Sequence, residues 1–444
     1  MSSAPRFRVL GRVLAAFMVA SGGRIRAESA DATAPLRVSE NHRYLLDSRG
    51  VPFLLQGDAG WSLIANTTRE EAAAYLQNRH SKGFNAVLVN LIEHKFAKNA
   101  PKNAYGEAPF PDISNLGATN EKYFEYADWV IREAAKNGIT VLLAPVYLGY
   151  PGLDEGFYDE VMANGPEKCQ AYGRFLGKRY AAFDNIIWIM GGDRDPGLAR
   201  EDVDMVAYGI RESDARHLMS AHCHSESSPI EQYPGSWLQV STSYAYEIVH
   251  QRLTWDYERK PAMPLFLIES VYEGEHNSSE VQIRRQAYWA VLCGEFGHVM
   301  GNLPIWSFSK GWQAAMDAPG SAAMMHWGRL FRSLPWQDLV PDSDHKLVTS
   351  GIGEFWGNDY LAAAATRDGS TLVAYMPTAR TITVDMSSLA KGKTNAWWYD
   401  PRSGKSSSGG TLDAMGSREF TPPSEGDWVL VLGNASKVPS APGQ

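Results

Sequence analysis

The chain has 444 residues, enough for a barrel of about 250 residues or more together with a smaller domain. Its 42 basic and 50 acidic side chains give a net charge of −8, which argues against a nucleic acid partner, because phosphate-binding surfaces are basic. Charged residues make up 21% and hydrophobic residues 44%, which excludes a disordered chain, and no run reaches the roughly 20 apolar residues of a membrane span.

The N-terminal region has the features of an export signal. Arginines between positions 6 and 12 precede a short apolar stretch at 13–20, and small residues follow it. Residues 1–27 are therefore predicted to be a signal peptide, so we expect an exported protein, periplasmic or secreted, with no membrane span once the signal is removed. A frayed tail is the alternative, because two arginines follow the apolar stretch.

From Tyr44 onward, short aliphatic runs alternate with longer amphipathic segments, which is the pattern of strand and helix units around a parallel sheet. Helix signals lie between the runs, such as the capping box formed by Thr68 and Glu71. Eight strands separated by helices predict a (β/α)₈ TIM barrel over residues 36–336. The eight runs are 53–56, 86–91, 140–146, 186–190, 218–222, 238–241, 265–268 and 299–306.

The pattern changes after Trp336. Short strands without room for helices, separated by Gly, Pro and Asp turns, predict a small all-β sandwich over residues 340–433. Its tryptophans Trp397, Trp398 and Trp428 are expected to be packed, so the domain should support the barrel and not form a sugar platform. The Ser-, Pro- and Gly-rich residues 434–444 are predicted to be a disordered tail.

Two carboxylates each end a clean apolar strand, Asp193 the fourth strand, after Gly191 and Gly192, and Glu269 the seventh. Reactive side chains of such barrels lie at these C-terminal strand ends. Two facing carboxyl groups are the minimum for cleaving an acetal, one donating a proton and the other attacking or stabilising positive charge. The narrow barrel mouth should bring them to about 5 Å, which favours retention of configuration. The structural alternative is helix capping, or pairing with an arginine such as Arg194.

Other polar and aromatic side chains at strand ends are predicted to bind a sugar, although plain packing is the alternative for about half of the aromatics. Trp306 is expected to end the eighth strand and to form the floor of a sugar subsite, with its ring against the sugar. Glu273 is the substitute candidate for the catalytic acid. His222 and His224 could ligate a metal, but no third ligand is evident, so no metal or cofactor is predicted. The predicted substrate-binding residues are Asp58, Trp61, Asn90, Tyr147, His222, Tyr244, Tyr272, Glu273 and Trp306.

At these residues the chain resembles the apiosidase-like glycoside hydrolases, a bacterial family of (β/α)₈ barrels. The resemblance implies retaining glycoside hydrolysis, with Asp193 as acid/base and Glu269 as nucleophile, and a family activity is the release of apiose-linked side chains from pectin. Val299-Met300 stands where Thr or Ser followed by Tyr is expected, so this edge of the pocket can differ. The matching stretches are 53–61, 83–87, 188–193, 269–274 and 297–306, while 398–404 and 426–432 resemble the collagen-binding-type module that accompanies the family.

The leading interpretation is an exported glycoside hydrolase that cleaves an oligo- or polysaccharide of plant or microbial origin, with an apiosidase acting on pectin as one candidate. A carbohydrate-binding protein without turnover is an alternative from another class, although both carboxylates needed for hydrolysis are present. Collagen binding is suggested only by the type of C-terminal module. The sequence has neither a His-Glu-x-x-His zinc motif nor a nucleophile elbow.

Overall fold

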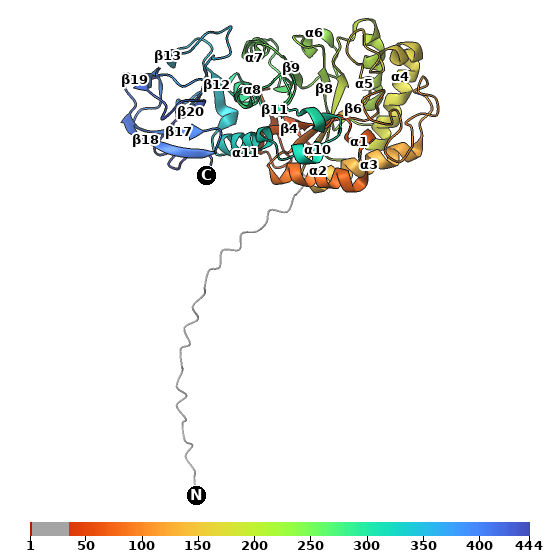
Figure 1. Ribbon diagram of the computed structural model, residues 1–444, viewed down its shortest axis with the longest axis horizontal. Coiled ribbons are helices and arrows are strands. Elements are labelled where there is room, and N and C mark those ends of the chain that lie inside the picture. The colour runs from red at the N-terminus through yellow and green to blue at the C-terminus, as the bar shows by residue number, and fades with distance from the viewer. Residues whose placement is uncertain (2–34) are drawn as a thin grey trace.

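Eight fully buried runs of four to six residues form one parallel sheet in the computed structural model, which describes Met1 and residues 35–444 (Figure 1). The sheet order places the fifth and sixth strands at its two ends. They meet where the Thr242 hydroxyl donates to the Ala221 carbonyl at 2.6 Å, which closes a (β/α)₈ barrel. The strands are β4 (Leu55–Ala59), β5 (Ala86–Asn90), β6 (Thr140–Ala144), β7 (Ile186–Gly191), β8 (Leu218–His222), β9 (Ser241–Tyr244), β10 (Leu265–Glu269) and β11 (Gly297–Met300).

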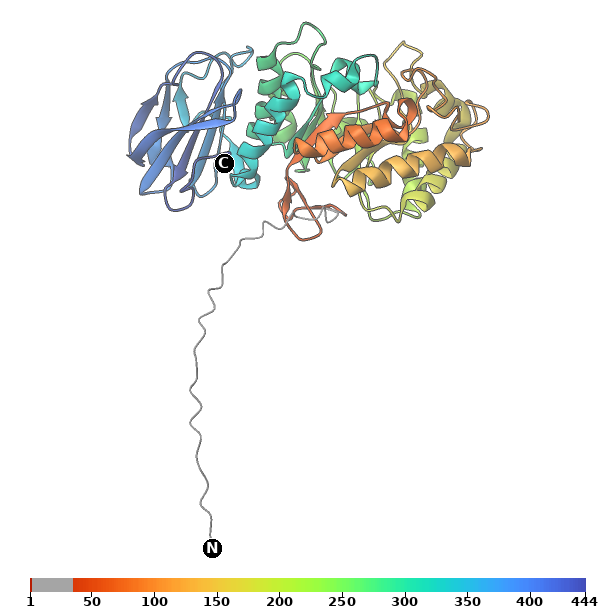
Figure 2. The same ribbon diagram turned by 60° about the horizontal axis from the view of Figure 1, so that its bottom comes forward.

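Helices cover the outside of the barrel, and Figure 2 shows the first two long ones, in orange, lying side by side. The predicted capping box is present, with the Thr68 hydroxyl accepting from the Glu71 backbone and the Glu71 carboxylate accepting from the Thr68 backbone. No helix of residues 35–444 has both the length and the apolar character needed to cross a membrane. The helices are α1 (Leu63–Asn66), α2 (Arg69–Ser81), α3 (Glu121–Lys136), α4 (Tyr158–Tyr180), α5 (Arg200–Arg211), α6 (Pro229–Gln232), α7 (Val249–Glu258), α8 (Glu280–Leu292), α9 (Leu303–Trp306), α10 (Trp312–Ala315) and α11 (Pro319–Arg332).

Two of the predicted strands are displaced in the structure. The sixth was expected at 238–241, but β9 starts at Ser241, and its Ser-Thr-Ser-Tyr sequence lacks the aliphatic side chains used as the signal. The eighth was expected to extend to Trp306, but β11 ends at Met300 and Trp306 belongs to α9. Pro304 lies in the first turn of α9, where proline favours a helix start over a continuing strand.

A short antiparallel sheet precedes the barrel. Its members Leu45 and Phe53 are buried in the same hydrophobic cluster as barrel residues such as Leu55. The N-terminal sheet is thus part of the barrel domain, and the predicted signal peptide lies outside the described residues. The three strands are β1 (Arg37–Val38), β2 (Leu45–Leu46) and β3 (Pro52–Phe53).

The C-terminal domain is a sandwich of two antiparallel sheets. A six-stranded sheet faces a three-stranded one, and Leu430 and Val384 meet in the core between them. Trp398 and Trp428 are each 7% exposed and the half-buried Trp397 packs against the shared core, so the prediction that these tryptophans are packed is confirmed. The strands are β12 (Leu339–Pro341), β14 (Ala362–Thr366), β15 (Thr371–Met376), β20 (Trp428–Asn434), β17 (Lys393–Asp400) and β18 (Lys405–Asp413) in the first sheet, and β13 (Val348–Ser350), β16 (Ile382–Asp385) and β19 (Ser417–Phe420) in the second.

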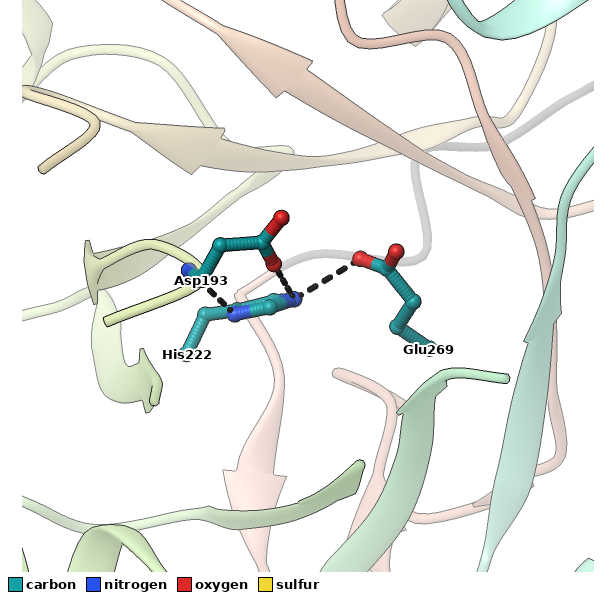
Figure 3. A group of neighbouring side chains, drawn as sticks. All are labelled: Asp193, His222 and Glu269. Atoms are coloured by element: carbon teal, nitrogen blue, oxygen red, sulfur yellow. Dashed lines mark hydrogen bonds and ion pairs between the residues drawn. The ribbon is translucent and has the colours of Figure 1, made fainter. Parts of the chain in front are cut away.

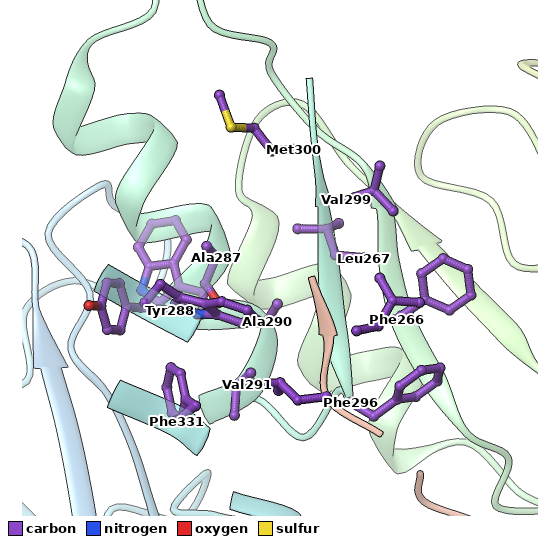
Figure 4. Close-up of a cluster of buried hydrophobic side chains, with 14 of the residues drawn as sticks. Phe266, Leu267, Ala287, Tyr288, Ala290, Val291, Phe296, Val299, Met300 and Phe331 are labelled. Carbon is purple, nitrogen blue, oxygen red and sulfur yellow. The ribbon is translucent and has the colours of Figure 1, made fainter. Parts of the chain in front are cut away.

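The barrel and the sandwich share one hydrophobic core (Figures 1 and 4). Helices α8 and α11 lie between the barrel and the six-stranded sheet and contribute side chains to this core. Tyr288 of α8 stacks on Tyr375 of β15 with ring centroids 4.5 Å apart. Beside them, Arg284 of α8 makes two hydrogen bonds to the Asp427 carboxylate, at 2.7 and 2.9 Å. Both side chains of this ion pair are less than 10% exposed, so the two domains are joined by buried contacts.

The tail over 434–444, expected to be disordered, packs against the rest of the protein. Val438 is buried, and its side chain fills the space left by the absent side chain of Gly433. The Gly443 backbone donates to the Ser333 hydroxyl at 2.8 Å. The composition of the tail gave no sign of this, because Val438 is the one branched aliphatic residue among residues 434–444.

Candidate active site

Asp193 lies two residues after the end of β7, where the backbone leaves the strand in an unusual conformation. Gly191, Gly192 and Asp193 have positive φ angles of 79°, 138° and 48°. A Cβ on Gly192 would lie 2.2 Å from the Tyr147 ring, and one on Gly191 would lie 2.4 Å from the His222 carbonyl oxygen. The two glycines therefore let the chain turn closely over the barrel mouth and place Asp193 above it.

Glu269 is the last residue of β10, where a β-bulge changes the course of the strand. The register against β9 shifts between Leu267 and Glu269, so that Glu269 pairs with Tyr244. Bulges of this kind are frequent at barrel rims and redirect side chains. The Tyr246 hydroxyl donates to Oε1 of Glu269 at 3.1 Å and accepts a bond from the Tyr244 hydroxyl at 2.9 Å. A chain of hydroxyl groups thus holds one oxygen of Glu269 in place.

His222, the last residue of β8, lies between the two carboxylates (Figure 3). The Asp193 backbone N–H donates to Nδ1 at 3.0 Å, so the neutral ring carries its hydrogen on Nε2. Nε2 lies 2.9 Å from Oε2 of Glu269 and 3.6 Å from Oδ1 of Asp193. Burial alone would lower the pKa of His222, but the bond to Glu269 and the charge of Asp193 raise it. One oxygen of Asp193 and one of Glu269 lie within 4.8 Å of each other.

The environment of Asp193 favours its protonated form. Burial, followed by the nearby charge of Glu269, raises the pKa of Asp193 to about 7, against the opposing effects of His222 and Tyr147. The Tyr147 hydroxyl donates to Oδ2 at 2.9 Å, whereas Oδ1 has no hydrogen-bond partner among the described residues. Oδ1 is itself buried and lies on the side of the carboxyl group that faces His222.

Aromatic side chains surround the two carboxylates. The Trp61 ring lies edge-on to Tyr147 and to His222, at 5.6 Å in both cases, and Tyr244 lies 4.9 Å from the His222 ring. The Trp61 indole N–H donates to the Tyr272 hydroxyl at 3.0 Å. All four aromatic side chains are at most 6% exposed, so they form a packed floor that fixes the carboxylates. Only the edges of these rings are left for a ligand to contact.

Asn90 ends β5 beside this floor, and its backbone N–H donates to the Trp61 carbonyl at 2.9 Å. Its side-chain amide is buried, yet neither the oxygen nor the nitrogen has a hydrogen-bond partner among residues 35–444. Buried amides are normally hydrogen-bonded. The Asn90 amide lies close to the Glu93 carboxyl group, where it opposes the rise of the Glu93 pKa to about 7 that burial causes.

Two of the predicted site residues are engaged in contacts with the outer helices. Asp58 lies buried on the outer face of β4, where it accepts hydrogen bonds from two side chains of α2, one of them the Arg79 guanidinium at 3.2 Å. Glu273 accepts from the Gly320 backbone at the start of α11 at 2.8 Å and from the Asn302 amide at 2.9 Å. Both carboxylates thus anchor helices, and neither joins the group around His222.

A cleft of about 760 Å³ opens beside Asp193. The Trp306 indole N–H donates to Oε1 of Glu275 at 3.0 Å, and Trp306 packs edge-on against Phe96, so this half-buried tryptophan supports the cleft wall. Glu155 and Glu275 escaped prediction because they lie inside loops, and loop sequence carries no periodic signal that fixes a side chain's direction. The other lining residues are Tyr150, Leu153, Glu155, Gly274, Glu275, His276 and Leu303.

Asp193, His222 and Glu269 also form the type of three-residue group that can hold a metal ion. The nitrogen of His222 that would face such an ion is already bonded to Glu269. His224, the other candidate ligand, has its Nδ1 2.8 Å from the Ser225 carbonyl oxygen within its own loop. Two members of the group are thus already joined by a hydrogen bond.

Comparison with known proteins agrees with this geometry. Residues 39–338 match the family "Apiosidase-like, catalytic domain", and residues 341–433 match "Putative collagen-binding domain of a collagenase". A solved structure titled "Glycoside hydrolase" is 27% identical, with a TM-score of 0.81 over 91% of this chain and 98% of its own. A glycoside hydrolase family 5 structure from Bacteroides vulgatus is 26% identical, with a TM-score of 0.81 over 90% of this chain and 94% of its own. A search of curated proteins found no match.

The family match covers nearly the whole barrel and includes both strands that carry the central carboxylates. The two solved structures extend the similarity through the sandwich as well. The barrel is therefore a glycosidase domain, and the chain belongs to the apiosidase-like family of glycoside hydrolases.

Proposed function

We propose that the protein is an exported, retaining glycoside hydrolase that cleaves a plant or microbial polysaccharide, with apiose-linked pectin side chains as one candidate substrate. The observation that carries the proposal is the pair of Asp193 and Glu269, which have oxygens within 4.8 Å of each other. The pKa of Asp193 is raised, and Glu269 accepts hydrogen bonds from two donors. Export is supported by the N-terminal sequence, and the apiose linkage by the family match.

In the first step, Glu269 attacks the anomeric carbon while Asp193 donates its proton to the oxygen of the leaving group. The carbon–oxygen bond breaks, its electron pair stays with the leaving oxygen, and an ester forms between the sugar and Glu269. The Tyr147 hydroxyl donates to Oδ2 of Asp193 and so holds this carboxyl group in place for the transfer. His222 and Tyr246 each donate to one oxygen of Glu269 and position it for attack.

In the second step, the ionised Asp193 takes a proton from water, and the water oxygen attacks the anomeric carbon and releases Glu269. Formation of the ester removes the negative charge of Glu269, which is one of the two main causes of the raised pKa of Asp193. The pKa of Asp193 therefore falls in the intermediate. The same group can act first as an acid and then as a base for this reason.

Two successive displacements are expected to release a sugar with the anomeric configuration of the substrate. Hydrolysis of pectic and hemicellulosic fractions, followed by proton NMR from the first minutes of reaction, measures this configuration before mutarotation. An inverted first product would contradict the proposal, because it would require water to act directly between the two carboxylates.

The rate of hydrolysis is expected to fall as the pH rises through about 7, because Asp193, with a pKa of about 7, then loses the proton that it must donate. Removing the Tyr147 hydroxyl by Tyr147→Phe takes away a bond that stabilises the ionised form, so it should move this decline to higher pH. The measurement is kcat/KM against pH. A substrate whose leaving group needs no proton should show no such decline, and a decline of equal size there would contradict the assignment.

Trp306→Ala is expected to raise KM about fivefold with little change in kcat, because the indole holds Glu275 at the cleft and the loss of one such hydrogen bond is worth about 1 kcal/mol. Tyr208→Ala is the matched control, since Tyr208 is 36% exposed on α5 and does not line the cleft. Steady-state kinetics and thermal unfolding of both variants test the idea. A large loss of melting temperature in Trp306→Ala alone would assign Trp306 to the core.

A further inference from the structure

Two exposed tryptophans lie side by side where the barrel meets the sandwich. Trp255 of α7 is 51% exposed, Trp356 of the loop after β13 is 64% exposed, and their ring centroids are 6.5 Å apart. They are the only two of the 14 tryptophans, all of which lie in the described part of the chain, that are more than half exposed. Single exposed apolar side chains are ordinary, but two that meet from different domains form a patch with a specific use.

The loop that carries Trp356 is fixed by hydrogen bonds from both domains. Arg285 of α8 donates to the side-chain oxygen of Asn358 at 2.8 Å. Arg380 of the sandwich donates to the Asp359 carbonyl at 2.6 Å. Trp356 therefore stays exposed on a backbone that is already ordered, so a ligand that covers its ring has little ordering entropy to overcome.

The size of the patch suits a sugar chain better than a protein partner. A tryptophan side chain has about 150–250 Å² of surface, so the two rings together expose on the order of 250 Å². A stable protein interface buries about 800 Å² on each partner. Exposed carboxylates border the patch, Glu258 three residues after Trp255 on α7 and Glu354 two residues before Trp356, and they limit its apolar area.

The chemistry of the patch matches the two kinds of surface on a sugar. The C–H groups of a pyranose face pack against a flat aromatic ring, and the hydroxyl groups around its edge can donate to carboxylates such as Glu258 and Glu354. The two rings meet at 72°, so they cannot both lie flat under one sugar unit. Each ring can instead take a different unit of one chain.

The patch is separate from the active site but lies on an element that begins near it. Neither Trp255 nor Trp356 lines the cleft beside Asp193. α7 follows β9, whose last residue Tyr244 packs against His222 at the barrel mouth, and it lies on the side of the barrel that faces the sandwich (Figure 1). A chain held on the patch is thus kept at the flank of the barrel, outside the cleft.

We propose that Trp255 and Trp356 form a second, non-catalytic binding surface for polysaccharide chains, built jointly by the barrel and the sandwich. The proposal goes beyond the proposed function, because binding at this surface needs no turnover. It also gives the sandwich a part in polysaccharide binding. The expectation that this domain forms no sugar platform rested on three packed tryptophans, and Trp356 is not one of them.

The test measures binding of the full chain to polymers. The Glu269→Gln substitution prevents hydrolysis during the measurement, and affinity electrophoresis in gels that contain pectin, xyloglucan or galactomannan gives a dissociation constant for each polymer. Trp255→Ala/Trp356→Ala is expected to weaken binding to at least one of them about tenfold, since two aromatic contacts are lost. Tyr208→Ala is the matched control, because Tyr208 is an exposed aromatic residue of α5, between β7 and β8, and its loss should leave binding unchanged.

Two further variants separate ring stacking from plain hydrophobic contact and from misfolding. Trp255→Tyr/Trp356→Tyr keeps flat rings and should keep most of the binding. Trp255→Leu/Trp356→Leu keeps apolar surface without a flat ring and should bind as weakly as the alanine variant. Thermal unfolding should be nearly the same for all of them, because both tryptophans are exposed.

Several outcomes would overturn the proposal. They are unchanged polymer binding in the alanine variant, equal binding by the leucine and tyrosine variants, and no retardation of the Glu269→Gln protein by any of the three polymers. Binding to a triple-helical collagen peptide that only the tryptophan substitutions abolish, with polymer binding intact, would assign the surface to a protein partner. Polymer binding through the two rings supports the proposal even if no fraction is hydrolysed and the proposed function fails.

Discussion

Glu269→Ala is expected to reduce turnover by roughly four orders of magnitude or more, because no other carboxylate of the group around His222 can form the covalent intermediate. Azide should partly restore the reaction by occupying the space of the lost side chain. It would then attack the anomeric carbon directly, in a single displacement, and the glycosyl azide should have the inverted configuration.

Asp193→Ala should give the opposite stereochemistry. With a good leaving group, Glu269 can still form the ester, and azide then attacks it in the second displacement, so the glycosyl azide should retain the substrate configuration. Product analysis by NMR therefore distinguishes the two roles, which a loss of activity alone would not.

Glu273→Gln is the control for both variants. Glu273 lies on the loop that follows Glu269, but its oxygens accept hydrogen bonds from Gly320 and Asn302, so this substitution should affect stability more than rate. Near-normal turnover in Glu269→Ala would overturn the assignment. So would rescue by azide of Glu273→Gln but not of Asp193→Ala.

The largest effect on stability is expected from Asp427→Ala. This substitution leaves the buried Arg284 guanidinium with only the exposed Glu280 carboxylate, 3.6 Å away, and removing one member of a buried ion pair typically costs about 3–5 kcal/mol. It also removes a hydrogen bond from the Tyr375 hydroxyl, at 3.1 Å. Denaturant unfolding followed by tryptophan fluorescence should show the loss, and both domains should be affected because they share one core.

Asp413→Ala tests whether burial is the cause. Asp413 pairs with Lys393 at 2.9 Å in the same domain, but the two side chains are 54% and 63% exposed, so its loss should cost at most about 1 kcal/mol. Replacing both Arg284 and Asp427 by leucine should recover part of the stability lost in Asp427→Ala. Equal losses in Asp427→Ala and Asp413→Ala would show that the buried pair has no special importance.

The sequence predicted the barrel and the placement of both central carboxylates because these features depend on strong local signals. Strands such as Ile186–Gly191 are apolar throughout. The polar residue at the C-terminal end of such a strand, here Asp193, lies at the barrel mouth. The direction of a side chain was harder to predict. Asp58 lies one position from inward-facing residues of β4, and alternation along the strand turns it outward to α2.

Other features were missed because their signals are weak. The edge strand β18 has the sequence Lys-Ser-Ser-Ser-Gly-Gly-Thr-Leu-Asp and is exposed over most of its length, so it forms through backbone pairing with β17 and not through burial. Its glycines indicated a turn. Glu155 and Glu275 meet in one cleft although 120 positions separate them in the chain. Such proximity follows only from the closed barrel.

The helix that follows the strand bearing Glu269 is also the helix that holds the sandwich, through Arg284 and Tyr288. A barrel paired with a different second domain would expose the Tyr288 ring and leave the Arg284 guanidinium without its carboxylate partner. The two domains therefore cannot be exchanged in the manner of independent modules, and they are expected to be inherited as a single unit. The solved relatives agree, since their similarity spans both domains over 90% or more of this chain.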